Sequence, residues 1–244
     1  MSERDRIKMK IQVADSKRWW GDDFDVRFFL ISKIHTIHDS VILDIGGGIG
    51  IICSEFDKSN LRVNLDNSFE DLKICKNKMD SDIQNVCASM TNLPFKNNSF
   101  HHIICSNILE VAKELDIKID NIEKNDQKII YPTMDNILSE SKRVLQNFGE
   151  MFITTPNNAY YNSKKLTFNE LNNLLKRNFL SFELYFFNTF PKFSNTKRKL
   201  NMANIIPKIL GNIVNSDKII KKLIKKKSKN NYSVSFFVKI KTKD

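Results

Sequence analysis

The chain has 244 residues, 41% hydrophobic and 27% charged, and a formal net charge of +11. This composition is ordinary for a globular protein, and the length suits one sizeable α/β domain with appendages. The sequence has no apolar run long enough to span a membrane, and its cysteines lack the C-x-x-C spacing of metal or redox sites. The charged N-terminal segment predicts no secretion signal.

The N-terminal part of the chain predicts a helical cap. Residues 17–38 are expected to form a helix, because apolar side chains recur close to helical spacing from Phe24 to Ile37. Trp19 and Trp20 lie at its start. The two tryptophans are expected either to anchor the helix on a sheet or to lie near a ligand.

The next segment predicts a nucleotide-binding unit. Val41–Ile45 is a short apolar run, typical of a strand buried in a parallel sheet, and four glycines follow between positions 46 and 50. From Ile51 the pattern becomes helical. Strand, glycine loop and helix form the ligand-binding turn of doubly wound folds. The dinucleotide fingerprint G-x-G-x-x-G/A needs a small residue at its third fixed position. That position is Ile51 when counted from Gly46 and Cys53 when counted from Gly48, which disfavours NAD and FAD.

The spacing Asp44-x-Gly46-x-Gly48-x-Gly50 resembles motif I of the class I S-adenosylmethionine (SAM) dependent methyltransferases. An ordinary glycine-rich turn is the plain alternative. SAM has no pyrophosphate, but its ammonium group suits a glycine loop with a carboxylate beside it. The resemblance implies that the loop binds the amino-acid end of SAM.

A second strand, Leu61–Asp66, ends in an acid that lies 22 residues beyond Asp44. This spacing matches the acidic residue about 20 positions on that binds a ribose. A carboxylate suits vicinal hydroxyls because its two oxygens only accept hydrogen bonds. Ser68 is expected to cap a following helix. The plain alternative for Asp66 is a solvent-facing strand end.

Two further segments are similar to strands three and four of the same family. They are Asn85–Phe95, which contains Leu-Pro-Phe, and Asn98–Glu110. Ser89 and His101 stand where the family usually has Asp. The resemblance therefore implies that adenine is recognised through backbone groups and an apolar cover from Met90. Asn107 follows the fourth strand at its carboxyl end, where ligands of such sheets lie.

The second half of the chain completes the expected sheet. Residues 112–132 are interpreted as an inserted flap, 135–145 as a helix and 151–155 as the fifth strand. Tyr160 and Tyr161 follow that strand, and Thr167 with Glu170 predicts a capping box at the start of the next helix. The aromatic and β-branched runs 182–187 and 233–240 are expected to be strands six and seven.

The positive charge is concentrated between these last two strands. Residues 188–229 contain 12 Lys or Arg and one acid, whereas the rest of the chain has 27 of each. Apolar stripes at helical spacing, the second opposed by lysines, predict basic amphipathic helices. Such helices favour an anionic membrane surface, an acidic partner or RNA, or they dock on the sheet with solvated lysines.

We therefore predict an α/β fold with a Rossmann-like, doubly wound seven-stranded sheet, an antiparallel last strand and helices on both faces. The expected divisions are an N-terminal helical cap (1–40), a SAM-binding core (41–187), a basic insert (188–229) and the final strand (230–244). The predicted cofactor-binding residues are Asp44, Gly46, Gly47, Gly48, Asp66, Asn67, Ser89, Met90 and Asn107.

The predicted function is SAM-dependent methyl transfer to a small-molecule or lipid-like acceptor by in-line displacement. Glu110, Tyr160 and Tyr161 are the candidate catalytic residues, and no metal is expected. An RNA methyltransferase that uses the basic insert and a catalytically silent SAM-binding module are the alternatives. We expect a cytoplasmic protein, with the insert in peripheral contact with a membrane or RNA.

Overall fold

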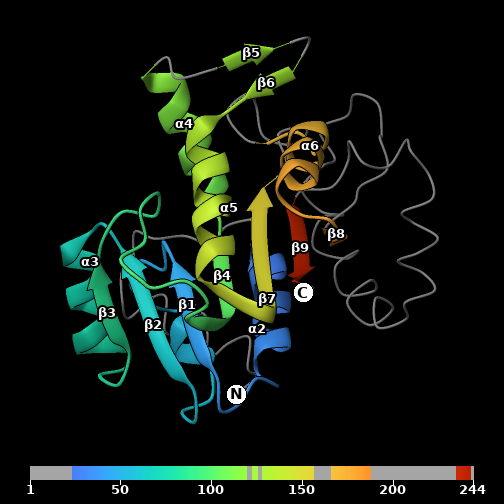
Figure 1. The fold of residues 1–244 in the computed structure, drawn as a ribbon. Helices are drawn as coiled ribbons and strands as arrows, with labels where there is room; N and C mark the ends of the chain where they lie inside the picture. The colour runs from blue at the N-terminus through green and yellow to red at the C-terminus, as the bar shows by residue number, and fades with distance from the viewer. Residues whose placement is uncertain (1–23, 120–122, 126–127, 157–165, 188–234, 243–244) are drawn as a thin grey trace, which may run out of the picture.

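The computed structural model describes residues 24–119, 123–125, 128–156, 166–187 and 235–242. The strands of its main sheet are β1 (Val41–Ile45), β2 (Leu61–Asp66), β3 (Gln84–Cys87), β4 (Phe100–Ser106), β7 (Leu145–Pro156), β8 (Glu183–Phe187) and β9 (Ser235–Lys241). Their order is β3-β2-β1-β4-β7-β9-β8, and only β9 runs antiparallel to its neighbours (Figure 1). The predicted Rossmann-like sheet is confirmed.

Helices cover both faces of this sheet. They are α2 (Phe24–Ile34), the 3-10 turn η2 (Cys53–Glu55), α3 (Phe69–Ile74), its π-helical continuation η3 (Cys75–Met79), α4 (Leu109–Lys118), α5 (Pro132–Val144) and α6 (Phe168–Asn178). A small hairpin, β5 (Glu123–Asn125) with β6 (Lys128–Ile130), joins α4 to α5. Figure 1 shows this hairpin beyond the end toward which the β7 arrow points.

The alternation of side chains along the buried strands divides the core in two. Leu43 and Ile45 of β1 pack in the larger apolar cluster, with residues of α4, α5 and α6. Ile42 points to the other face, where it packs with α2 and with Phe56. Successive side chains of a strand face opposite ways. Asp44 therefore shares the face of Ile42.

One predicted helix is much shorter than expected. The apolar pattern from Ile51 was predicted to be a helix, but the structure has turns and then the 3-10 turn η2. Ile51 and Phe56 are nevertheless buried. Only a short connection separates the glycine loop from β2. Near the end of this connection, the Asp57 carboxylate accepts a hydrogen bond from the Ser59 amide. Helices this short gain little from propagation, because nucleation is costly.

The prediction that residues 112–132 form an inserted flap is wrong in its first half. Helix α4 extends through Lys118, and only the hairpin that follows is an addition beyond the sheet. Lys113 and Asp116 are buried on the inner side of α4, whereas Val111 and Leu115 are exposed. This inverted pattern hid the helix from a search for apolar periodicity.

The local signals at helix starts are confirmed. The Ser68 hydroxyl accepts a hydrogen bond from the Asp71 amide at the start of α3. Thr167 and Glu170 form the predicted capping box of α6. Of the predicted helix 17–38, residues 24–34 form α2, with Ile31 and Ile34 buried against the sheet. The prediction is wrong for residues 35–38, where the chain forms a turn and then an irregular segment.

Three predicted features lie outside the described residues: Trp19 with Trp20, Tyr160 with Tyr161, and the basic insert 188–229. The strands that flank the insert are described. Phe187, the last residue of β8, is paired with Ser235, the first of β9, and Ser235 is paired with Pro156 of β7. The chain therefore leaves and rejoins the sheet at its carboxyl edge, the edge at which the parallel strands end.

Candidate functional site

The glycine loop leaves the carboxyl end of β1 and turns toward β2. The amides of Gly46 and Gly47 donate to the Leu65 carbonyl oxygen at 2.7 and 3.2 Å. Gly46 and Gly48 have φ angles of +66° and +54°. These angles lie in the left-handed region, which residues with a Cβ rarely adopt. The glycines are thus required by the path of the backbone.

The loop also packs directly on the carboxyl end of β4. A Cβ on Gly46 would overlap the side chain of Ile108, which follows that strand. Beside it, Asn107 has a φ of +56°. Its amide donates to the Thr154 carbonyl at 2.8 Å, and its Oδ1 accepts from the Thr154 hydroxyl at 3.0 Å. Asn107 therefore lies where β1, β4 and β7 end together.

Asp66 lies half-buried at the end of β2 and faces the loop. Its Oδ2 accepts a hydrogen bond from the Gly48 amide at 2.8 Å, and its Oδ1 accepts from the Ser68 amide at 2.9 Å. A carboxylate has about four acceptor positions, so two bonds leave capacity for ribose hydroxyls. The side chain would thus fix the loop as well as a ligand.

The predicted adenine residues are tied to the same edge. The Ala88 amide donates to the Asp66 carbonyl at 3.1 Å, which brings Ser89 and Met90 beside the end of β2. Ser89 is exposed, with its hydroxyl 2.8 Å from that of Thr91, and Met90 packs against the main core. Asn67, next to Asp66, is exposed.

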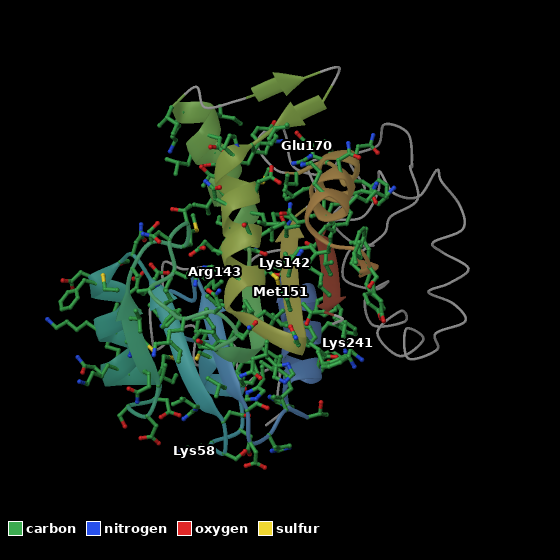
Figure 2. The ribbon with its side chains drawn as sticks, in the orientation of Figure 1. Lys58, Lys142, Arg143, Met151, Glu170 and Lys241 are labelled. Atoms are coloured by element: carbon green, nitrogen blue, oxygen red, sulfur yellow. The ribbon has the colours of Figure 1, made fainter. Side chains whose placement is uncertain are left out.

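An arginine holds the Leu-Pro-Phe segment after these residues. The Arg143 guanidinium donates to the carbonyls of Phe95 and Leu93 at 2.8 and 2.9 Å. It also pairs with Glu140, whose Oε2 accepts from the Leu93 amide at 2.8 Å. Figure 2 shows Arg143 at the end of α5, on the side facing β1 and β2. The sequence alone did not indicate this role, because Phe95, Leu93 and Asn97 lie far from Arg143 along the chain.

Of the three candidate catalytic residues, the structure describes Glu110. It lies in the first turn of α4, and its Oε2 accepts from the Thr155 hydroxyl of β7 at 3.3 Å. Both residues are therefore near Asn107, at the carboxyl edge. Tyr160 and Tyr161 follow β7 beyond the described residues. Within the described part of the chain, no group of three His, Cys, Asp or Glu residues could hold a metal ion.

The cysteines beneath the loop are not suited to nucleophilic chemistry. Cys53 and Cys75 are free and buried. Burial raises the pKa of Cys75 to about 11, and burial with the charge of Asp44 raises the pKa of Cys53 well above its usual range. Thiols of this kind stay protonated and inert at neutral pH. Cys105 is likewise free and buried, and Cys87 is free and exposed.

The described residues fit SAM. The loop backbone is free of side chains where it approaches the end of β4, and a carboxylate stands at the end of β2. These are the elements that an amino-acid moiety and a ribose require. Gly46, Gly47 and Gly48 would surround the amino-acid end, with the fully buried Asp44 beneath them. Asp66 and Asn67 would surround the ribose, and Ser89 and Met90 the adenine.

Known proteins share part of this sequence and its fold. Residues 43–125 match the family model described as a methyltransferase domain. An uncharacterised protein of Methanocaldococcus jannaschii is 27% identical over 151 residues, which are 62% of this chain and 54% of that protein. The chain thus spans about half the length of the curated relative it matches.

Two solved structures share the fold. The YcgJ protein of Bacillus subtilis has a TM-score of 0.54 at 13% identity, over 90% of this chain and 99% of that one. A SAM-dependent methyltransferase of Archaeoglobus fulgidus has a TM-score of 0.52 at 15% identity, over 99% and 95%. Residues 43–125 are thus similar to a methyltransferase domain, and the chain shares the fold of these two structures.

Proposed function

We propose that this protein transfers the methyl group of SAM to a small-molecule or lipid-like acceptor by in-line displacement. The observation that carries the proposal is the meeting of three elements at one edge of the sheet. The glycine loop contacts Ile108, Asp66 binds the loop amide of Gly48, and Asn107 is bonded to the end of β7. Cofactor groups and an acceptor would therefore share one place.

SAM supplies an electrophilic methyl group on a sulfonium. The work left to the protein is to align a nucleophile with that methyl and to exclude water. The loop and Asp66 would hold the cofactor. Asn107, in a left-handed conformation bonded to Thr154, would form the wall between cofactor and acceptor.

Glu110 is the described residue best placed to act on the acceptor. A carboxylate there would orient a cationic acceptor or accept a proton from a neutral one, and a base helps only where the nucleophile carries a proton that must leave. Tyr160 and Tyr161 remain candidates for orienting the acceptor.

Isothermal titration with SAM and with NAD tests the cofactor. We expect SAM to bind and NAD not to bind, and the reverse would overturn the proposal. The acceptor is best sought by incubating a cell extract with the protein and isotopically methyl-labelled SAM, and then identifying labelled products by mass spectrometry. Labelled RNA instead of a metabolite or lipid would favour the RNA alternative.

Replacing Asp66 with asparagine should weaken SAM binding by about ten- to a hundredfold, because hydrogen bonds to a charged acceptor contribute about 1.5–3 kcal/mol. The amide also keeps only one of the two acceptors that serve Gly48 and Ser68. Asp71→Asn, in the first turn of α3, is the control and should bind like the wild type. Equal affinities for the two variants in a titration would show that Asp66 is not the ribose anchor.

The basic insert supports a second candidate, an RNA methyltransferase. Strand β8 ends and β9 begins at the carboxyl edge, so the insert between them would bring its positive charge near the acceptor. RNA binding that falls steeply with salt, and less steeply after alanine substitution of Lys221, Lys222, Lys225 and Lys226, would favour this function. Salt-dependent binding to anionic lipid vesicles, with the same variants weakened, would instead favour peripheral contact with a membrane.

A SAM-binding module without activity is the third candidate, because Ser89 brings no charge to the adenine position. Cofactor binding without turnover on any metabolite pool would support it.

None of the helices in the described ranges is long and apolar enough to span a bilayer.

A further inference from the structure

A row of polar side chains crosses three neighbouring strands beneath the glycine loop. Asp44 of β1 is paired in register with Asn64 of β2, and Asn64 with Asn85 of β3. Asp44 and Asn64 are fully buried. Burying an amide costs free energy unless its hydrogen bonds are remade inside the protein. A buried asparagine in the middle of a parallel sheet therefore requires an explanation.

The amide group of Asn64 is held in one orientation. Its Nδ2 donates to the Gly48 carbonyl oxygen at 3.0 Å and to Asn85 Oδ1 at 3.1 Å. Asn85 is itself fixed, because its Nδ2 donates to the Ile83 carbonyl at 3.3 Å. Asn64 Oδ1 then points at Gly47, where a Cβ would overlap it.

Gly48 is consequently held on both sides by β2. Its N–H donates to Asp66 Oδ2 at 2.8 Å, and its C=O accepts from Asn64 Nδ2. Asn64 and Asp66 are two positions apart, so their side chains leave the strand on the same face. The residue between these two bonds has a φ of +54°. The pair thus fixes a left-handed residue at the centre of the loop.

We propose that Asn64 is a positioning residue for the cofactor, acting through Gly48. The inference rests on the proposed use of the glycine loop to bind SAM. Without Asn64, the buried Gly48 carbonyl has lost a donor, and the loop can adopt other conformations. Ordering it again on binding would reduce the affinity for SAM, because preorganisation lowers the cost of association.

Asn64→Leu tests this proposal, with Asn60→Leu as its matched control. Both residues are buried asparagines beside or within β2, and each donates two hydrogen bonds through Nδ2. Asn60 precedes β2 and lies at the amino edge of the sheet, opposite the glycine loop. Figure 2 shows this edge at the labelled Lys58, at the other end of the molecule from Glu170. Both variants should lose stability, but only one of them touches the loop.

We expect Asn64→Leu to bind SAM about five- to tenfold more weakly than the wild type, the effect of one hydrogen bond lost, and Asn60→Leu to bind with unchanged affinity. Titration is done at a temperature where both variants are folded. Hydrogen exchange provides a second readout. Peptides that contain Gly48 should exchange faster in Asn64→Leu than in Asn60→Leu at equal global stability.

Equal SAM affinities and equal exchange in the two variants would overturn the proposal. If Asn64→Leu does not fold, Asn85→Ala is used in its place to test the proposal. Asn85 is half-buried, and its Oδ1 is the acceptor that orients the Asn64 amide. This variant should weaken SAM binding about two- to threefold, and wild-type affinity would overturn the proposal. A wild-type protein that does not bind SAM would instead refute the proposed function.

Discussion

Replacing Gly46 with alanine is expected to abolish measurable SAM binding and to lower the free energy of unfolding by about 2–4 kcal/mol. Two effects add at this position. The φ of +66° disfavours any residue with a Cβ, and the new methyl group would overlap Ile108, which is buried between the loop and α4. Urea denaturation measures the stability, and titration with SAM measures the binding.

Gly149→Ala is the matched control for this result. Gly149 lies in β7, away from the glycine loop, and a Cβ there would crowd Leu145 and the Gln146 carbonyl. This variant should also lose stability but keep its affinity for SAM. Adding Ile108→Ala to Gly46→Ala should relieve the overlap but not the φ strain, and so recover only part of the stability. Wild-type affinity in Gly46→Ala would contradict the placement of the cofactor on this loop.

Replacing Lys113 with methionine is expected to lower the free energy of unfolding by about 2 kcal/mol, because the partly buried Glu170 carboxylate then loses its charged partner. The Lys113 ammonium is buried and donates to both carboxylate oxygens of Glu170 at 2.8 and 2.9 Å. Glu170 also accepts from the Tyr131 hydroxyl at 3.0 Å and caps α6. The pair thereby joins α4, α6 and the chain entering α5.

The same pair predicts a pH dependence. Burial raises the pKa of Glu170, but the hydrogen bonds from Lys113 and Thr167 outweigh it and hold the pKa below its usual value. The folded state therefore binds fewer protons than the unfolded state in acid. The stabilisation is complete above the unfolded pKa of about 4.3 and is lost as the pH falls through the lower folded value.

Urea denaturation at several pH values between about 3 and 6, the range in which carboxylates titrate, measures both the loss of stability and its pH dependence. In Lys113→Met the stability should be lower and should change less with pH. Lys142→Met is the control, since Lys142 is exposed on α5 (Figure 2), and should stay within about 0.5 kcal/mol of the wild type. A Lys113→Met protein as stable as this control would show that the pair contributes nothing.

The sheet could be predicted from sequence because its central strands contain short runs of apolar and β-branched residues bounded by turn residues. Val41–Ile45 and Leu61–Asp66 were predicted with the bounds that the structure has. The helix caps at Ser68 and Thr167 were predictable for a similar reason, since a cap is formed by residues three positions apart. Such signals are local, and tertiary packing does not override them here.

What the sequence did not reveal depends on contacts between distant segments. Helix α4 turns Lys113 and Asp116 inward because their partners, Glu170 and Thr133, lie on other elements. The role of Asn64 could not be predicted from the strand that contains it, because the role depends on hydrogen bonds to Gly48 and Asn85 on other segments. The alternation of Arg62, Asn64 and Asp66 on one face of a buried strand was the available hint of a polar interior.

Strand β8 is the last in the sheet order and pairs with β9, which lies between it and β7. The chain from Phe187 to Ser235 therefore closes a loop whose two ends are already neighbours. Closing such a loop costs only about 0.6 kcal/mol more for each doubling of its length. Insertions and deletions there thus change the cost of closing the loop only slightly, and two strands, β4 and β7, separate β9 from β1. Under the proposed function, changes in this segment would alter the surroundings of the acceptor and leave the strands of the cofactor site unchanged.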